Sequence, residues 1–157
     1  LSEDDNAKVY EAFKRVAKKK DINEKDLEAV IATSALQVPP TYKVVDYVIN
    51  SGNIITPTAV ITLEKNGKEL KGMSTGDGPF EAALLAIEQI VGHHYELDDF
   101  QIQSVTEGSE AVGNALIKLR ANGVLYSGNG ISTDIVGASI RAYVSALNKI
   151  VYEEDAR

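Results

Sequence analysis

The chain has 157 residues, with 16 basic and 23 acidic side chains and a formal net charge of -7. This length suits one ordinary domain with a small extra piece, and the negative charge argues against a nucleic-acid partner. The absence of cysteine excludes disulfides and thiolate chemistry, and no apolar run is long enough to cross a bilayer. Because the acidic start at 1–5 is unlike a signal peptide, we expect a cytoplasmic protein without a membrane partner, and interpret the leading Leu1 as the mark of a fragment.

Residues 1–38 predict a small helical subdomain that precedes the main domain. Val9, Phe13 and Val16 recur on one helical stripe, and lysines 18–20 fall in the last turn, where they complement the helix dipole. A second short helix is predicted from a cap-like Asn23 towards the proline pair at 39–40. We interpret the lysines as a solvated helix end rather than a basic binding patch.

From Tyr42 onwards the apolar pattern changes to a period of two, which is typical of strands. Strands are predicted over 42–48, 58–63 and 69–73, and the Asn66-Gly67 pair between the last two predicts a tight hairpin turn. Pro79 then suits the first position of a helix, whose apolar face is predicted to carry Phe80, Leu84, Ile87 and Val91. Three strands are thus followed by one covering helix.

The same order returns 56 residues later without a gap. Ala59 aligns with Ala115, Ile61 with Ile117, Asn66-Gly67 with Asn122-Gly123, Gly72 with Gly128, Ala82 with Ala138 and Ala86 with Ala142. The second helix is predicted to bury Val136, Ile140, Tyr143, Leu147 and Ile150. Two copies of so long a unit predict one α+β domain over 39–157, in which two βββα repeats (about 42–92 and 98–150) form two layers with pseudo-twofold symmetry.

No residue pattern supports catalysis. The two histidines, His93 and His94, are adjacent, and neighbouring side chains diverge on a regular backbone, which disfavours a zinc site. We interpret them as part of a solvated acidic loop, with metal binding as the weaker alternative. Acidic residues and serines are plentiful, but none has a partner at a spacing that indicates acid-base or nucleophilic chemistry.

Glycine-rich turns precede both predicted helices. Gly76-Asp77-Gly78 and 127–130 lie where free backbone N–H groups and the helix dipole favour an anion such as a carboxylate. The second turn superficially resembles a dinucleotide-binding fingerprint, but its third glycine is missing. Tight turning between strand and helix is the structural alternative for both glycine clusters.

Several strings taken together resemble the C-terminal regulatory region of the 2-isopropylmalate synthase family, which includes the citramalate synthases. They are 76–83 (GDGPFEAA), Asp99-Phe100 followed by 105–108 (VTEG), 133–136 (TDIV) and 146–148 (ALN). Residues 13–20 and 26–28 are similar to that family's helical linker between the catalytic barrel and the regulatory domain. The resemblance covers nearly the whole chain.

The resemblance implies a regulatory role. The parent enzymes condense acetyl-CoA with a 2-oxo acid in a metal-dependent TIM barrel that is longer than this whole chain. It implies that this fragment is not itself an enzyme, holds no cofactor, forms a homodimer, contacts its own barrel, and binds leucine as feedback inhibitor. Any divalent metal belongs to the barrel. Isoleucine, as in many citramalate synthases, and a dimerisation module without effector binding are the alternatives.

The resemblance also implies an effector site, carried over position by position. N–H groups around Gly76 and Gly78 are expected to hold the carboxylate, and Asp77 or a nearby carbonyl the ammonium group, with Glu81 beside them. The remaining residues are expected to line the apolar pocket: Leu97, Phe100, Ser104, Ala111 and, from the second repeat, Ile131. Relatives more often carry Tyr where Phe100 stands. Without the resemblance, Leu97, Phe100 and Ile131 are ordinary core residues.

Overall fold

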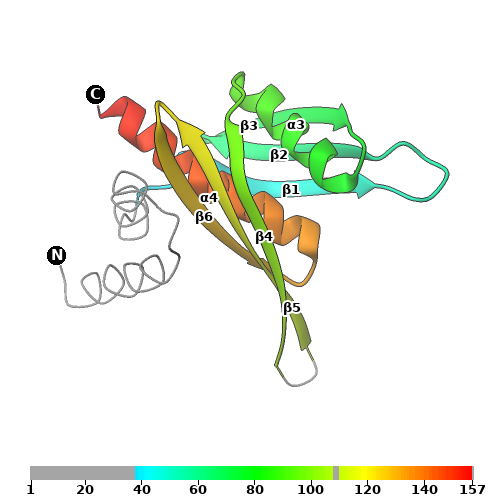
Figure 1. The fold of residues 1–157 in the computed structure, drawn as a ribbon. Coiled ribbons are helices and arrows are strands. Elements are labelled where there is room, and N and C mark those ends of the chain that lie inside the picture. Colours follow the sequence, from blue (N-terminus) through cyan, green and yellow to red (C-terminus); the bar gives the residue numbers. More distant parts are fainter. Residues whose placement is uncertain (1–37, 108–109, 157) are drawn as a thin grey trace.

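The computed structural model describes residues 38–107 and 110–156, which form two successive βββα units (Figure 1). The first comprises β1 (Lys43–Asn50), β2 (Thr58–Lys65), β3 (Lys68–Thr75) and α3 (Pro79–Val91). The second comprises β4 (Glu96–Glu107), β5 (Glu110–Ala121), β6 (Val124–Ser132) and α4 (Ile135–Asp155). The α+β class and the two repeats predicted from the sequence are confirmed. The predicted linker helices lie outside the described residues.

Each repeat makes its own antiparallel three-stranded sheet, in the order β1-β2-β3 and β4-β5-β6. Both predicted Asn-Gly turns are present, and in each the two residues adopt positive φ: 54° and 76° at Asn66 and Gly67, 53° and 76° at Asn122 and Gly123. These angles suit the type I′ turn that matches the right-handed twist of paired strands. The hairpins β2–β3 and β5–β6 are therefore equivalent.

The first strands of the two repeats are related by a different offset from the rest. Tyr47 pairs with Ile61, and Phe100 pairs with Ile117, so β1 and β4 correspond at 53 residues rather than 56. Each of these strands contains a register shift near its start, between Val44 and Asp46 and between Leu97 and Asp99. The second repeat therefore has three more residues between these paired positions, and they lie in its β4–β5 hairpin, whose strands are longer than β1 and β2.

The inner face of each sheet, defined as the face turned towards its helix, forms the core. α3 packs on β3 and β2, α4 packs on β6 and β5, and the two helices touch each other. The fully buried side chains from both repeats include Ile61, Leu63, Ala82, Ala86, Ile87, Ile117, Leu119, Ala138, Ile140, Ala142, Tyr143, Leu147 and Ile150. The predicted α4 stripe is thus buried almost throughout, whereas on α3 the alanines take the deepest positions and Phe80, Leu84 and Val91 are half-buried.

Two glycines let the helices approach the sheets closely. A Cβ added to Gly72 would lie 2.1 Å from the carbonyl oxygen of Ala86, and one added to Gly128 would lie 2.1 Å from that of Ala142. Gly128 and Ala142 occupy the positions equivalent to Gly72 and Ala86, so both helices pack on their sheets in the same way. This shared contact explains why the repeat is visible in the sequence as matched Gly and Ala positions.

The repeats are joined by hydrogen bonds between β1 of the first and α4 of the second. The buried Asn148 side chain accepts from the backbone N–H of Tyr42 (2.8 Å) and donates to its carbonyl (3.0 Å). At the other end of α4, the Tyr47 hydroxyl donates to Asp134 at 2.6 Å. β1 therefore belongs to the first sheet and also fixes the position of α4. Among the described residues, no helix has the length and apolar character needed to cross a membrane.

Candidate functional site

The N-terminus of α3 has no side-chain cap. Gly78 is the N-cap residue, Pro79 follows it, and the first helical hydrogen bond runs from Ala82 N–H to the Gly78 carbonyl (3.0 Å). A helix leaves its first N–H groups without intrahelical partners, and together with the helix dipole they favour an anion. Of the residues predicted to hold a carboxylate, Gly78 lies at this open end.

The other predicted residues of the glycine turn are partly engaged within the chain. Gly76 donates its N–H to the Pro57 carbonyl at 3.1 Å, and Asp77 donates its N–H to Glu81 Oε1 at 3.2 Å. A Cβ on Gly76 would lie 2.5 Å from the Ala82 nitrogen, so this glycine is needed for close packing. The turn therefore brings Gly76, Asp77, Gly78 and Glu81 together, but Gly76 contributes backbone shape rather than a free donor.

The equivalent end of α4 carries its own carboxylate. Asp134, which occupies the position of Gly78, accepts the Gly137 N–H at Oδ1 (2.7 Å) and the Tyr47 hydroxyl at Oδ2 (2.6 Å). This hydrogen bond is the main cause of the raised pKa of Tyr47, because ionisation would remove the proton that the hydroxyl donates, and burial raises the pKa further. A Cβ at Gly137 would lie 2.2 Å from the Tyr47 hydroxyl oxygen, so the glycine makes room for the contact.

An aromatic pair borders the open end of α3. The rings of Phe80, in the first turn of α3, and Phe100, on β4, meet edge to face with centroids 4.0 Å apart. Phe100 occupies the position of Tyr47 in the other repeat, so each helix start faces an aromatic residue from the opposite repeat. Because Phe100 has no hydroxyl and Gly78 no carboxylate, the contact made at α4 is absent at α3.

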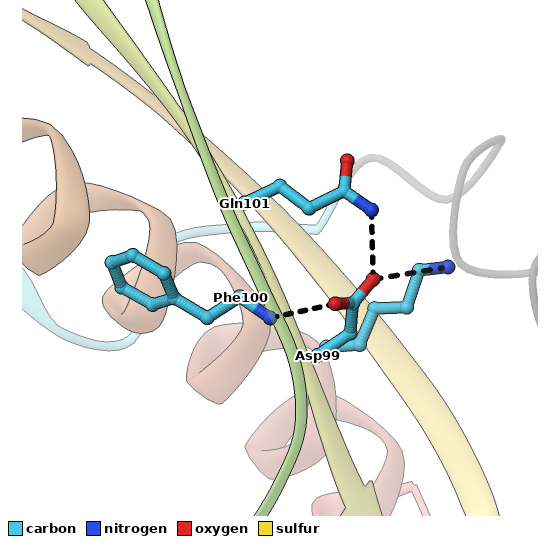
Figure 2. Close-up of polar contacts among 4 residues, drawn as sticks. Asp99, Phe100 and Gln101 are labelled. Atoms are coloured by element: carbon cyan, nitrogen blue, oxygen red, sulfur yellow. Dashed lines mark hydrogen bonds and ion pairs between the residues drawn. The ribbon is translucent and has the colours of Figure 1, made fainter.

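The backbone around Phe100 is held by its neighbour Asp99. The Asp99 carboxylate accepts the Phe100 N–H at 2.9 Å and the Gln101 side-chain amide at 3.0 Å, and Lys118 lies 4.0 Å away. Figure 2 shows that the Phe100 ring points to the other side of β4 from this carboxylate. The polar groups thus stay on the outer face, and the ring is left to the inner, apolar side.

Leu97 lies on the same face of β4 as Phe100. Leu97 pairs with Leu119 and Phe100 with Ile117, and Leu119 and Ile117 both point to the core. Three residues apart on a regular strand would place the two side chains on opposite faces, but the register shift after Leu97 restores the same face. Leu97 remains 38% exposed, so it is available to a ligand.

The last three predicted pocket residues lie further along the second sheet. Ser104 pairs with Gly113, and Ala111 pairs with Thr106, towards the end of the β4–β5 hairpin. Ile131, on β6, is paired with Asn114, which is paired with Gln103 on β4. Because successive residues of a strand point to opposite faces, Gln103 points away from the inner face on which Phe100 lies. Within one chain Ile131 therefore points to the opposite face from Phe100, and it is 64% exposed.

Ile131 instead borders a groove of about 460 Å³ between β6, β1 and α4. Lys43 and Arg141 supply the charged groups of this groove, and Val44 and Val144 supply apolar ones. A smaller groove of about 360 Å³ occupies the equivalent place beside α3, where Glu88, Gln89 and His94 lie. Neither groove contains the residues at the N-terminus of α3.

The adjacent histidines do not converge. His94 Nδ1 lies 2.6 Å from Glu88 Oε1, whereas the His93 ring packs against Tyr95 with centroids 4.4 Å apart. Within residues 38–107 and 110–156, no group of three or more His, Cys, Asp or Glu side chains is arranged to hold a metal ion. Gly92, His93 and His94 are exposed, as the prediction of a solvated loop requires, whereas Tyr95 at the end of the loop is buried.

Sequence reasoning missed the Tyr47–Asp134 contact and the Asn148 bridge. The signal for the first was available, because Thr133-Asp134 stands where Asp77-Gly78 stands in the aligned repeats, and aspartate is a preferred N-cap residue. Nothing in the sequence places Tyr47 beside it. The arrangement at α3 offers backbone donors, carboxylates and an apolar wall, which suits binding of a small zwitterion.

Comparisons with known proteins identify the family of the chain. Residues 21–151 match a family model described as the LeuA allosteric (dimerisation) domain. The 2-isopropylmalate synthase of Clostridium kluyveri is 37% identical over 154 residues, which cover 98% of this chain and 30% of the relative. The 2-isopropylmalate synthase of Carboxydothermus hydrogenoformans is 37% identical over 159 residues, which cover 100% of this chain and 31% of the relative. That of Dictyoglomus turgidum is 39% identical over 153 residues, which cover 96% of this chain and 30% of the relative. The chain thus spans about 30% of the length of these relatives.

Proposed function

Because the chain belongs to the LeuA allosteric (dimerisation) domain family, we propose that it is the regulatory region of a 2-isopropylmalate synthase that binds leucine and holds two copies together. In this proposal the condensation of acetyl-CoA with a 2-oxo acid, and any divalent metal it uses, belong to a barrel outside this chain. Leucine acts as feedback inhibitor.

The observation that carries the proposal is the difference between the two helix starts. Asp134 supplies a carboxylate to the Gly137 N–H at α4, whereas Gly78 leaves the same position empty of any side chain at α3. A Cβ added to Gly78 meets no atom within 4 Å, so there is space at that point. The leucine carboxylate is proposed to occupy, at α3, the place that the Asp134 carboxylate takes at α4.

The remaining groups of leucine have matching partners nearby. The exposed Asp77 carboxylate is the proposed acceptor for the ammonium group, with Glu81 beside it. Phe80, Phe100 and Leu97 supply an apolar wall for the four-carbon side chain, since burying it is favourable by about 1.5–3 kcal/mol. Ser104 and Ala111 extend this wall along the hairpin in the proposal. Ile131 is left out of the single-chain site because it faces away from Phe100.

Inhibition then follows from linkage. Leucine lowers the activity of the distant barrel only if it binds one arrangement of the regulatory region more tightly than the other. Phe100 and Leu97 come from the second repeat, and Gly78 and Asp77 from the first. A ligand between them is therefore sensitive to how the repeats are placed.

The test is calorimetric titration of the protein with leucine, isoleucine and valine, combined with thermal scans. We expect leucine to bind and to raise the melting temperature by mass action. Gly78→Asp should abolish this binding, because it adds to α3 the internal carboxylate that α4 already has. Asn129→Asp, which adds the same charge at an exposed position on β6, should bind leucine like the parent chain.

Two other outcomes would change the proposal. Isoleucine binding without leucine binding would make the chain the sensor of a citramalate synthase, since one methyl position in an apolar pocket is worth only about 1–3 kcal/mol. No heat and no thermal shift with any of the three amino acids would leave a dimerisation module without an effector. Retention of binding in Gly78→Asp would move the carboxylate site away from α3.

A further inference from the structure

The starts of β1 and β4 are equivalent places in the two repeats, but they are joined to the neighbouring helix differently. Tyr42, just before β1, corresponds to Tyr95, just before β4, at the offset of 53 residues, and both side chains are buried. β4 follows α3 after the short connection 92–95, so the chain itself ties the start of β4 to the end of α3. The start of β1 lies beside α4 without such a connection, because α4 comes at the far end of the sequence.

Asn148 supplies a non-covalent link at this second place. Its side chain, on α4, accepts the Tyr42 N–H at 2.8 Å and donates to the Tyr42 carbonyl at 3.0 Å. Its equivalent in the first repeat is Gly92, with which the connection from α3 to β4 begins. One junction between the repeats is therefore a stretch of chain, and the other is a pair of hydrogen bonds that can open and close. We call this pair the Asn148–Tyr42 link.

The proposed leucine site lies across the covalent junction. Gly78 belongs to α3 and Phe100 to β4, and these are the two elements that residues 92–95 connect. Each repeat is a sheet packed on its own helix, so a ligand held by both elements fixes the placement of one repeat relative to the other. A change of placement at the covalent junction alters the separation of the repeats at the opposite junction, where the Asn148–Tyr42 link lies.

We propose that Asn148 is a positioning residue for feedback regulation, because it couples the leucine site to residues 38–42, the segment that leads from the predicted linker into β1. The inference deepens the proposed function and rests on it. Leucine bound at α3 inhibits a barrel outside this chain only if binding favours one placement of the segment that leads to it. Asn148 is not part of the proposed leucine site, so it affects leucine only through the placement of the repeats.

The surroundings of the Asn148–Tyr42 link allow it to open without unfolding the domain. Tyr42 and Asn148 line the groove of about 460 Å³ between β1, β6 and α4. Exposed Arg141 lines the same groove, so water reaches it and can replace the Asn148 amide on the Tyr42 backbone. The Tyr42 ring is held separately by Lys65 of β2, whose Nζ lies 5.1 Å from the ring centroid. Tyr42 therefore stays with the first repeat when its link to α4 opens.

The first repeat contains a matched contact for comparison. Gln89, on α3, accepts the Met73 N–H of β3 at 3.1 Å. Like Asn148, it is a helix residue whose side-chain amide bonds a strand backbone, but here both partners belong to one repeat. A ligand that changes the placement of the two repeats is expected to leave this bond unchanged.

The first test is calorimetric titration of the wild type, Asn148→Ala and Gln89→Ala with leucine. The site described above exists with the Asn148–Tyr42 link closed, so leucine is expected to favour the closed link. Asn148→Ala should therefore bind leucine about fivefold or more weakly than the wild type. Gln89→Ala, the matched control, should stay within about twofold of the wild type. Circular dichroism shows whether both variants fold.

The second test needs no substitution. Amide hydrogen exchange of the wild type is followed by NMR with and without saturating leucine. By reciprocity, leucine should slow exchange of the Tyr42 N–H by about fivefold or more, whereas the Met73 N–H should change by less than about twofold. A residue that only stabilises the fold would not separate the two amide protons.

The outcomes separate this inference from the proposed function. A wild type that does not bind leucine overturns the effector role and the coupling together. Equal leucine affinity in the wild type and Asn148→Ala, or equal slowing of the Tyr42 and Met73 amide protons, overturns the coupling and leaves the effector role standing. If Asn148→Ala does not fold, the two amide protons of the wild type decide.

Discussion

The N-terminus of α4 contains its own anion, whereas that of α3 does not, although both helices start after equivalent strands and pack on equivalent sheets. At α4 the group consists of Asp134, Tyr47 and Gly137; at α3 the same positions hold Gly78, Phe100 and Glu81. Every one of the three differs. One helix start of the duplicated unit is therefore capped by its own carboxylate, whereas the other has no side-chain cap and is the place proposed for the leucine carboxylate.

The helices also differ at their C-termini. α3 ends at Gly92, whose φ of 77° suits glycine, while α4 continues through Asn148, the residue equivalent to Gly92, to Asp155. Asn148 holds β1, and the next residue, Lys149, donates to the Ser127 carbonyl on β6 at 2.7 Å. Asn148 therefore joins the two halves, whereas Lys149 fixes α4 on its own sheet.

The largest expected effect comes from the substitutions Gly72→Ala and Gly128→Ala, which test whether the two helices pack on their sheets equivalently. Each new Cβ would overlap a helix carbonyl oxygen at 2.1 Å, so we expect each variant to lose about 3 kcal/mol of unfolding free energy. Gly52→Ala, in an exposed loop, should change it by less than about 0.5 kcal/mol. Urea unfolding followed by circular dichroism measures all three. If only one of the two core variants is destabilised, the helices do not pack equivalently.

The sequence allowed the fold to be predicted where local chemistry repeats. The Asn-Gly turns and the Gly72 and Gly128 contacts recur at one offset. The proline at the start of α3 has no counterpart at α4, but it is favoured locally at a first helical position. The offset of 53 between β1 and β4 was not predicted, because strand pairing with register shifts is decided by partners distant in sequence.

The candidate site was predictable only in part, for the same reason. Gly76, Asp77, Gly78 and Glu81 are neighbours along the chain, so their meeting at α3 needs no tertiary information. The approach of Phe100 to Phe80 depends on how the two repeats pack, and the orientation of Leu97 depends on the register shift that follows it. The side of the sheet on which Ile131 lies is likewise set by register, which no local pattern of β6 reveals.

Lys149 offers a pH test of the contacts unique to the second repeat. Burial lowers its pKa to about 8, below the value of about 10.4 in an unfolded chain. The unfolded state therefore binds more protons between these values, so the wild type should gain stability as pH rises from about 8 to about 10.4. Lys149→Met should be more stable than the wild type at pH 7 by about 1–2 kcal/mol, since it removes the buried charge but also the bond to Ser127.

Chemical unfolding of the wild type and Lys149→Met from pH 7 to 10.5 measures this effect. The advantage of the variant should shrink across the upper part of the range, where the wild-type lysine loses its proton. An advantage that stays constant with pH, or a wild type that loses stability steadily above pH 8 relative to the variant, would contradict the burial of a charged amine at this position.

The smallest expected effect comes from building at α3 the aspartate–tyrosine hydrogen bond that α4 has. Gly78→Asp adds the carboxylate and Phe100→Tyr adds the hydroxyl, but Glu81 stands at the position of Gly137, where a Cβ would lie 2.2 Å from the tyrosine hydroxyl. The new hydrogen bond should therefore form only when Glu81→Gly is present. A double-mutant cycle of Gly78→Asp and Phe100→Tyr in that background is expected to show about 1 kcal/mol of favourable coupling, and no coupling when Glu81 is retained. Equal coupling in both backgrounds would mean that the two helix starts are not geometrically equivalent, and leucine could then not be placed at α3 by analogy with Asp134.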